Sequence, residues 1–268
     1  MLKDITLGQY FPGNSVIHRL DPRTKLIVLI AYMVALFVAS GWIAYGVLLL
    51  FLLATIRIST IPGKAIIRGM KPLVMILIFT GVLNLFFTSD GRVLVKFWVI
   101  TITTGGVERA AFMMARILML ITATFLLTYT TSPISLTDGL ESLMNPLKAV
   151  KVPVHELSMM MCIALRFIPT LIEETDKIMS AQKARGADFE SGKLVDRAKA
   201  LIPILVPLFI SAFRRADELA TAMECRCYQG GEGRTKMKQL HYRRNDFAAF
   251  AAAALLVAAV IVLKNLGL

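Results

Sequence analysis

The sequence has little charge, few acidic residues and few cysteines. Only 18% of its 268 residues are charged, whereas 56% are hydrophobic and the mean hydropathy is +0.67. A soluble domain of this length does not need so much apolar surface, so the composition excludes an ordinary soluble protein and predicts a chain that faces lipid. The apolar residues also occur in blocks separated by charge-rich stretches, which is typical of membrane spans.

Acidic residues are scarce relative to basic ones. The chain has 18 acidic and 30 basic residues, which gives a formal net charge of +12. A basic balance of this size favours nucleic acid, anionic lipid or acidic protein as partners, and the high hydropathy makes nucleic acid the weakest of the three. We therefore expect contacts with membrane lipid and with other proteins.

Cysteine is present at only three positions, Cys162, Cys225 and Cys227. An odd number of cysteines, all in a part of the chain that we expect in the cytoplasm, excludes a disulfide framework. Cys225 and Cys227 lack the further ligands that a structural metal needs, so reduced thiols are favoured and metal binding is the minor alternative. His155-Glu156 begins like the helix of a zinc protease, but Met159 stands where the second histidine would be. The sequence predicts no metal site and no cofactor.

Five apolar runs predict five transmembrane helices. The runs cover roughly Leu26–Ala39, Trp42–Ile56, Pro72–Phe87, Ala110–Tyr129 and Phe247–Leu263. The longer runs approach the length of about 20 residues that crosses a bilayer. If the two short first runs form a hairpin, the basic residues before and after them share one side, as the excess of Lys and Arg on cytoplasmic loops predicts. This places the N-terminus and the segment after the fourth run in the cytoplasm, and the C-terminus outside.

The segment between the third and fourth runs differs in composition from the spans. Residues 93–103 are rich in β-branched and aromatic side chains, and they are bounded by Asp90-Gly91 and Gly105-Gly106. This pattern predicts a short extracellular hairpin or a re-entrant piece.

The stretch from Thr131 to Asp246 is too long for a connector and has helical patterns. Apolar residues recur at helical spacing from Pro153 to about Arg185, and again from Leu194 to about Arg226. We therefore predict an all-α integral membrane protein with about five transmembrane helices and a cytoplasmic helical domain between the fourth and fifth spans. Its divisions are an N-terminal membrane region of four spans (1–131), the cytoplasmic domain (132–246) and a C-terminal transmembrane helix (247–268).

An arginine and an asparagine inside the predicted spans are candidates for an intramembrane role. Arg116 is in the fourth run, and an ionisable residue within a membrane is a candidate functional site. An equally good interpretation is that its side chain reaches toward the outer interface. Asn84 in the third run is interpreted as a residue that hydrogen-bonds between helices.

A group of carboxylates lies on the first long cytoplasmic helix. Glu173, Glu174 and Asp176 resemble a general acid and base set, because titratable groups gather at active sites. A solvated or ion-paired helix face, opposite Arg214 and Arg215, is the favoured interpretation.

The two long cytoplasmic helices end in similar tripeptides, Ala184-Arg185-Gly186 and Cys225-Arg226-Cys227. Small neighbours allow a partner to approach closely, and an arginine offers a planar fork to carboxylates or carbonyls. The alternative is that each arginine complements the negative C-terminus of its helix, with Gly186 as a left-handed cap. Two such ends in one domain make a paired docking surface as good an interpretation as the caps alone.

Several segments give the chain a resemblance to a known family over nearly its whole length. They are His18-Arg19-Leu20-Asp21-Pro22-Arg23-Thr24-Lys25, Thr131-Ser132-Pro133, Leu165-Arg166-Phe167-Ile168-Pro169, Ala181-Gln182-Lys183-Ala184-Arg185-Gly186 and Ala222-Met223-Glu224-Cys225-Arg226-Cys227-Tyr228. With these segments the chain resembles the transmembrane scaffold of energy-coupling factor transporters, the EcfT family, which also includes the homologous subunit of cobalt and nickel importers.

The resemblance implies a non-catalytic scaffold that joins two cytoplasmic ABC-type ATPases to a small substrate-binding membrane subunit. In that family two long coupling helices end in Ala-Arg-Gly-type motifs that enter grooves on the ATPases. Arg185 matches such a motif fully, whereas Arg226 matches by position and has Cys225 and Cys227 in place of alanine and glycine. The implied process is the uptake of a vitamin or a transition metal, with the choice of substrate made by the separate binding subunit.

Two other classes of function remain as alternatives. One is a membrane-embedded enzyme that acts on a lipid substrate through Arg116 or the carboxylates, although no nucleophile, base and orienting group converge in the sequence. The other is a self-sufficient channel or carrier, which would need more polar residues within its spans.

Overall fold

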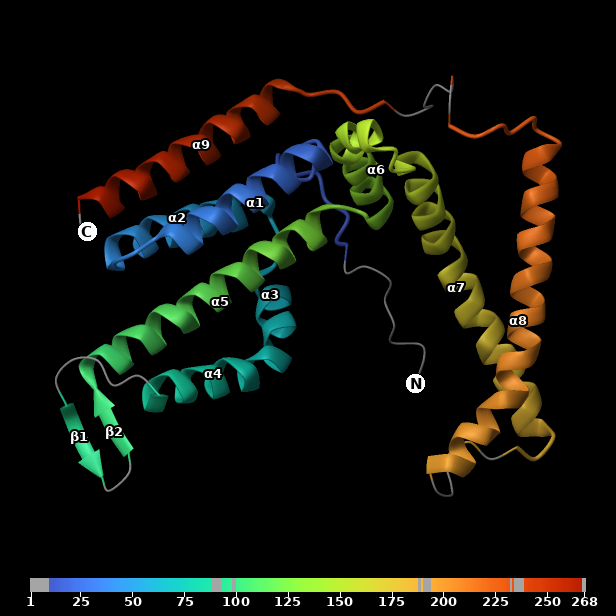
Figure 1. Cartoon of the computed structure of the whole chain (residues 1–268), viewed down its shortest axis with the longest axis horizontal. Coiled ribbons are helices and arrows are strands. Elements are labelled where there is room, and N and C mark those ends of the chain that lie inside the picture. Colours follow the sequence, from blue (N-terminus) through green and yellow to red (C-terminus); the bar gives the residue numbers. More distant parts are fainter. Residues whose placement is uncertain are drawn as a thin grey trace. The chain divides into compact units, whose positions relative to one another are not determined.

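The computed structural model of the chain is helical apart from one hairpin (Figure 1), and it describes residues 10–87, 93–97, 100–187, 189, 194–231, 233 and 239–266. The helices are α1 (Pro22–Val38), α2 (Trp42–Ser59), α3 (Gly63–Met70), α4 (Val74–Phe87), α5 (Thr104–Thr130), α6 (Pro133–Met144), α7 (Val154–Ala184), α8 (Leu194–Glu224) and α9 (Arg244–Asn265). Two 3-10 helices, η2 (Lys71–Leu73) and η3 (Asn145–Val150), and two strands, β1 (Val93–Phe97) and β2 (Ile100–Thr103), complete the elements.

The chain forms two compact units. One, which we call the bundle unit, comprises Gly8–Gly139 with Leu240–Leu268, and the other, the paired-helix unit, contains Leu140–Gln239. The predicted divisions after residues 131 and 246 fall near these limits but stay a prediction.

Among the described residues, five helical segments are long enough and apolar enough to cross a membrane, which confirms the predicted number. They are α2, the continuous segment Gly63–Phe86, α5, α7 and α9. The set differs from the predicted one in two members. With 17 residues, α1 is at the lower limit for a span because it ends before the turn at Gly41, where φ is +100°. Helix α7 qualifies because Glu156 and Arg166 are its only acidic, lysine or arginine residues between Val154 and Ile172.

The core of the bundle unit lies among α1, α2, α5 and α9. These helices meet through small and aliphatic side chains, and Figure 1 shows α1, α2 and α9 running alongside one another. The residues buried there are Tyr32, Ala35, Leu36, Ala39, Ala44, Tyr45, Leu48, Leu52, Met119, Ala123, Leu256 and Val260. Helix α4 packs on α5, where a Cβ at Gly81 would come within 2.8 Å of the Met114 sulfur. A larger residue here would have to displace the Met114 side chain, so glycine favours the close approach of the two helices.

The hairpin predicted between residues 93 and 103 is confirmed. Strands β1 and β2 are antiparallel, with Val95 opposite Ile102 and Phe97 opposite Ile100. Thr103 ends the hairpin and begins α5, because its hydroxyl accepts the backbone N–H of Gly106 at 3.1 Å. The extracellular location of this hairpin stays a prediction.

The paired-helix unit is dominated by α7 and α8, each of 31 residues. Their contacts run in opposite sequence order, since Gln182 donates to the carbonyl oxygen of Pro203 while Glu174 contacts Ser211. The two helices are therefore antiparallel, and Figure 1 shows them crossing. The predicted helix ends, near Arg185 and near Arg226, agree with the structure.

Candidate functional site

The C-terminal end of α7 is closed by a glycine in the left-handed conformation. Gly186 has φ of +90°, the N–H of Gly186 donates to the carbonyl of Lys183 at 3.0 Å, and that of Ala187 donates to Gln182 at 3.0 Å. These are the hydrogen bonds of a Schellman motif, which satisfies the last carbonyls of a helix. The predicted cap at Gly186 is confirmed, and Arg185 is the residue that immediately precedes it.

The end of α8 has the same geometry without a glycine. Cys227 has φ of +55°, and its N–H donates to Glu224 at 2.8 Å, while the N–H of Tyr228 donates to Met223 at 3.0 Å. A residue with a Cβ in this region costs about 1 kcal/mol relative to glycine. Arg226 therefore stands in relation to Cys227 as Arg185 does to Gly186. The sequence did not predict this geometry at the end of α8, because a cysteine is no indication of a positive φ.

All six residues of the two ends are exposed, namely Ala184, Arg185, Gly186, Cys225, Arg226 and Cys227. In the part of the chain that the structure describes, neither Arg185 nor Arg226 forms an ion pair within the chain. Because α7 and α8 are antiparallel, the two arginines lie at opposite ends of the helix pair, as Figure 1 shows for the ends of α7 and α8. The paired-helix unit thus presents two separate, similarly built cationic tips.

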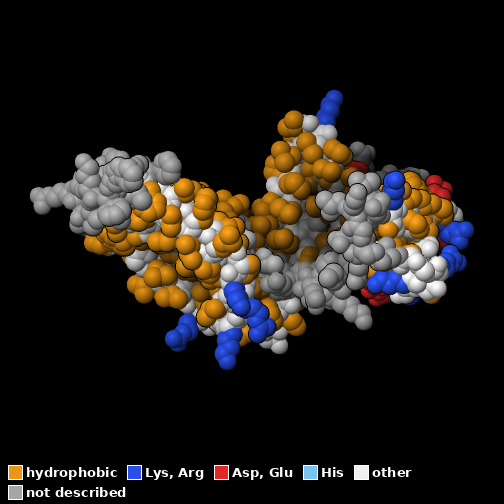
Figure 2. Space-filling model, turned by 90° about the horizontal axis from the view of Figure 1, so that it is seen from below, with side chains coloured by type: hydrophobic (Ala, Val, Ile, Leu, Met, Phe, Trp, Pro, Cys, Tyr) orange, Lys and Arg blue, Asp and Glu red, His pale blue; other side chains and the backbone are white. Residues whose placement is uncertain are grey.

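Helix α8 also exposes a long apolar face. Its large hydrophobic side chains, between 46% and 68% exposed, are Leu201, Ile202, Leu205, Val206, Phe209, Ile210 and Phe213. On the face in Figure 2, hydrophobic side chains cover most of the described surface and the basic ones gather in small groups. An apolar surface of this extent is typical of contact with lipid or with another apolar protein.

One of the predicted carboxylates joins α7 to α8. Glu174 accepts a hydrogen bond from the Ser211 hydroxyl and, at 2.9 Å, one from Nη2 of Arg215. This confirms the ion-paired helix face with Arg215 as the partner, whereas Arg214 is exposed. Glu173, Glu174 and Asp176 are therefore not gathered at one site.

A second carboxylate contact joins α6 to α7. Glu141 is 8% exposed, and its carboxylate contacts Nδ1 of His155 at 3.2 Å and accepts from the Ser158 hydroxyl at 2.9 Å. His155, which resembled a zinc ligand in the sequence, is therefore occupied by a structural contact. Within the described ranges no three His, Cys, Asp or Glu residues are placed to hold a metal ion, and the three cysteines are free thiols.

The segment before α1 forms a polar junction with the start of α9. Asp246 is 1% exposed, and its carboxylate accepts the backbone N–H groups of Asp21 at 2.8 Å and of Arg243 at 2.7 Å. Asp21 in turn caps α1 by accepting the N–H of Arg23, with Pro22 at the first helical position. Burial would raise the pKa of Asp21, but hydrogen bonds and the charge of Arg23 outweigh it and lower the pKa.

Lys25 ties this junction to the end of α5. Its Nζ donates to the carbonyl of Thr130 at 2.9 Å, to the Thr131 hydroxyl at 3.1 Å and to the carbonyl of His18 at 3.3 Å. Sequence reasoning identified the segment from His18 to Lys25 through its resemblance, but missed Asp246. The available signal was a carboxylate in the first turn of the last helix.

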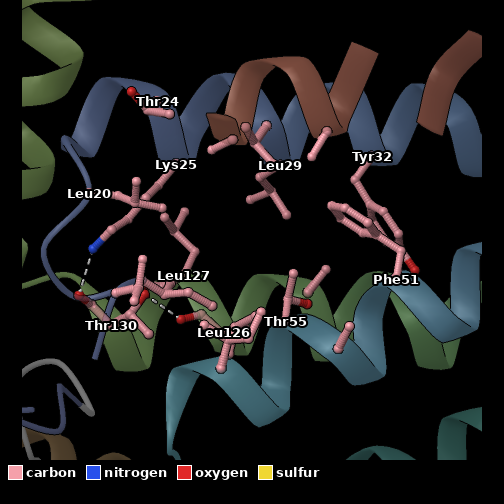
Figure 3. A pocket seen from close by; sticks show the side chains of 18 of the residues that line it. Leu20, Thr24, Lys25, Leu29, Tyr32, Phe51, Thr55, Leu126, Leu127 and Thr130 are labelled. Carbon is pink, nitrogen blue, oxygen red and sulfur yellow. Dashed lines mark hydrogen bonds between the residues drawn. The ribbon is translucent and has the colours of Figure 1, made fainter. Parts of the chain in front are cut away.

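An apolar cavity of about 340 Å³ opens between α1, α2, α5 and α9. Figure 3 shows Lys25 reaching from α1 toward Thr130 at one end, and Tyr32 beside Phe51 at the other. The two rings stack with centroids 6.1 Å apart. The cavity is lined almost entirely by hydrocarbon, so it holds no arrangement of groups for chemistry.

Arg116 and Asn84, the two intramembrane candidates from the sequence, line one cavity of about 430 Å³ together with Arg109. Arg116 donates from Nε to the Tyr45 hydroxyl at 2.9 Å and lies over the ring of Phe37. Asn84 donates to the carbonyl of Thr80, one turn earlier in its own helix, at 2.9 Å. This hydrogen bond lies within α4, and an interhelical hydrogen bond of Asn84 stays a prediction.

Comparison with known proteins gives a consistent result. The family model described as CbiQ, cobalt transport protein, matches residues 13–237. The chain is 57% identical over 261 residues to the energy-coupling factor transporter transmembrane protein EcfT of Thermosediminibacter oceani, covering 97% of this chain and 98% of that protein. It is 51% identical to the protein of the same description from Ruminiclostridium cellulolyticum, with 98% of each chain covered. It is 46% identical to that of Bacillus subtilis, covering 98% of this chain and all of the relative.

Proposed function

The chain belongs to the EcfT family of energy-coupling factor transporter transmembrane proteins, and from that membership we propose that it couples two cytoplasmic ATPases to a substrate-binding membrane subunit. It is a multi-pass membrane protein and the transmembrane component of a transporter, and it is not an enzyme. Under the proposal, ATP is hydrolysed in the partner subunits, and this chain passes their movement into the membrane.

The observation that carries the proposal is the matching geometry of the two helix ends. Arg185 and Arg226 each precede a left-handed residue that closes a Schellman motif, and both are exposed between small neighbours. One such end is an ordinary helix cap, but two at opposite ends of an antiparallel pair suit two copies of a similar groove. Each guanidinium offers a forked donor to carboxylates or carbonyls of an ATPase.

The apolar face of α8 supports the membrane side of the proposal. Its large exposed side chains, such as Phe209 and Phe213, need an apolar environment, and a small membrane subunit supplies one. When the ATPases close on ATP, they would draw the two tips together or apart, and the apolar faces of α7 and α8 would tilt or release that subunit. The cargo is a vitamin or a transition metal, chosen by the substrate-binding subunit.

The distribution of charge supports a cytoplasmic N-terminus and an extracytoplasmic C-terminus. Arg19 precedes α1, Arg23 lies in its first turn, and Arg57 and Lys64 flank the α2–α3 turn. The excess of basic residues at this end of the helices favours it as the cytoplasmic side. The proposed cytoplasmic coupling domain, 132–246, follows from the same orientation. The hairpin at the start of α5 would then face outward.

The test is a double charge reversal at the tips, Arg185→Glu with Arg226→Glu. Reversal replaces attraction by repulsion at each contact and leaves a buried partner charge unpaired, which costs about 2–5 kcal/mol per contact. We expect the ATPases to be lost when the tagged chain is purified from membranes in mild detergent, while the yield of inserted chain is unchanged. The matched control is Arg166→Glu with Arg214→Glu, since these arginines are exposed on the same two helices. Unchanged ATPase recovery with the tip variant would overturn the docking assignment.

A further inference from the structure

The crossing of α7 and α8 depends on few buried contacts. In the described part of the paired-helix unit, the only buried hydrophobic side chains are Val154, near the start of α7, and Ile204 of α8. Dispersion and burial therefore contribute little to fixing the angle and register of the two helices. Polar contacts between the two helices therefore contribute more to fixing their angle and register.

The main polar contact is the cluster of Glu174, Ser211 and Arg215. Both carboxylate oxygens of Glu174 are used, one by the Ser211 hydroxyl and the other by Nη2 of Arg215. The Arg215 and Glu174 side chains are 38% and 22% exposed, and Nε of Arg215 is buried with no partner among the described residues. Loss of Glu174 would leave this half-buried guanidinium without its counter-charge, which is more costly than loss of an exposed ion pair.

The position of the cluster relates it to the tips. Glu174 precedes Arg185 by 11 residues, and Arg215 precedes Arg226 by 11 residues. At a rise of 1.5 Å per residue, each tip is about 16 Å along its helix from the cluster. Because the helices are antiparallel, the two tips extend from the cluster in opposite directions by equal lengths.

We propose that Glu174, Ser211 and Arg215 form a polar cluster, which we call the lock, that fixes how α7 and α8 cross. The lock thereby sets the separation of Arg185 and Arg226 and transmits movement of one tip to the other. These three are positioning residues, because they act through the arginines and touch no partner in this role. The inference rests on the proposed function for its consequence in transport, but the lock itself is a property of this chain alone.

The lock is tested by the distance between the two helices near their tips. Ser180 and Thr221 are exposed and each lies five residues before its arginine, so nitroxide labels at Ser180→Cys and Thr221→Cys report the tip separation. The background substitutions are Cys162→Ser, Cys225→Ala and Cys227→Gly, the last two copying the α7 end. Pulsed electron resonance on the full chain in lipid nanodiscs then gives the distribution of distances.

We expect a single narrow distribution in the parent, and a broad or shifted one in Glu174→Gln and in Arg215→Met. The charge swap, Glu174→Arg with Arg215→Glu, should restore a narrow distribution because the pair is rebuilt with its partners exchanged. Matched controls are Glu173→Gln and Arg214→Met, the neighbouring exposed residues of the same types. They should leave the distribution unchanged.

The role in coupling is read from the same labels after the ATPases and the membrane partner are bound and MgATP is added. We expect the parent distance to shift and the lock variants to lose that shift while still retaining the ATPases. Distributions unchanged by both lock variants overturn the lock. A broadened distribution with a normal response to MgATP overturns its positioning role. If the variant with both tip charges reversed still retained the ATPases, the proposed function would be overturned. The lock would not be, because it is tested by the distances in the isolated chain.

Discussion

The two units of the chain are stabilised in different ways. In the bundle unit, Leu36, Leu48 and Val260 are fully buried among four helices, and Asp246 and Lys25 close its polar end. In the paired-helix unit, the described residues include few buried hydrophobic side chains, and carboxylates bridge one helix to the next. The bundle unit thus carries its own core, whereas the paired-helix unit leaves its apolar surface available to other molecules. This division suits the proposed coupling role, in which one part of the chain stays anchored and another moves.

The largest expected effect is the difference in stability between two alanine substitutions, one in each unit. Leu48→Ala removes a fully buried side chain and should lower the stability of the chain by about 2–5 kcal/mol, because the lost packing leaves a cavity. Phe209→Ala, at a side chain that is 60% exposed, should change it by less than about 0.5 kcal/mol. The measurement is the unfolding of the purified chain in mild detergent.

The same pair of variants sharpens the comparison in the assembled transporter. Phe209→Ala should reduce recovery of the membrane partner, whereas Leu48→Ala chains that remain folded should recover it normally. Equal losses of stability in the two variants would mean that the paired-helix unit has a core of its own, which contradicts the contrast drawn above.

A smaller effect is expected at the polar junction of the bundle unit. Asp246→Ala leaves the buried N–H of Asp21 and the part-buried N–H of Arg243 without an acceptor, which should cost about 2–3 kcal/mol. Asp217→Ala, at an exposed aspartate of α8, is the control and should be nearly neutral. Thermal unfolding in detergent measures both, and a neutral Asp246→Ala would show that the junction does not hold α1 and α9 together.

The smallest effect is a dependence on pH in the bundle unit. Burial and the nearby charge of Lys25 lower the pKa of His18, although its contact with the carbonyl of Phe11 opposes them. A lowered pKa means that folding disfavours the protonated imidazole, so the stabilisation is complete above about pH 6.5, the ordinary value. It is lost as the pH falls from there through the lowered pKa of the folded chain.

The measurement is unfolding in detergent at a series of pH values between 7.5 and about 5. We expect a decline smaller than that caused by either substitution above, and His18→Gln should flatten it. His241→Gln, at an exposed histidine, should leave the decline in place. A profile that His18→Gln does not alter would assign the dependence to other groups.

Much of the fold could be predicted because apolar runs and turn residues are local signals. The runs gave the number of spanning helices, and Asp90-Gly91 with Gly105-Gly106 bounded the hairpin. It was harder to predict which helices span the membrane, because α7 is apolar enough to qualify although it was expected outside the membrane. Length and hydropathy do not distinguish an apolar helix that faces lipid from one that faces a partner.

The candidate site was predictable in part for the same reason. The glycine at position 186 predicted a left-handed helix end. The left-handed conformation of Cys227 could not be predicted, because cysteine is not a residue type that favours it. The choice of Arg215 over Arg214 as the partner of Glu174 depends on how α7 and α8 face each other, which a single sequence does not encode locally. Asp246 was missed for two reasons. One of its hydrogen-bond donors, Asp21, is distant in the sequence, and the other, Arg243, lies in the irregular segment before α9.

The two tips, alike in backbone, differ in chemical reactivity. Cys225 and Cys227 place two exposed thiols around Arg226, while the α7 tip has none, and Cys162 is only partly accessible. A thiol-directed reagent of modest size therefore marks one tip of the natural chain and spares the other. The proposed ATPase contact at the α8 tip can thus be blocked or cross-linked while the one at the α7 tip is left unmodified, although the two tips are nearly alike in backbone.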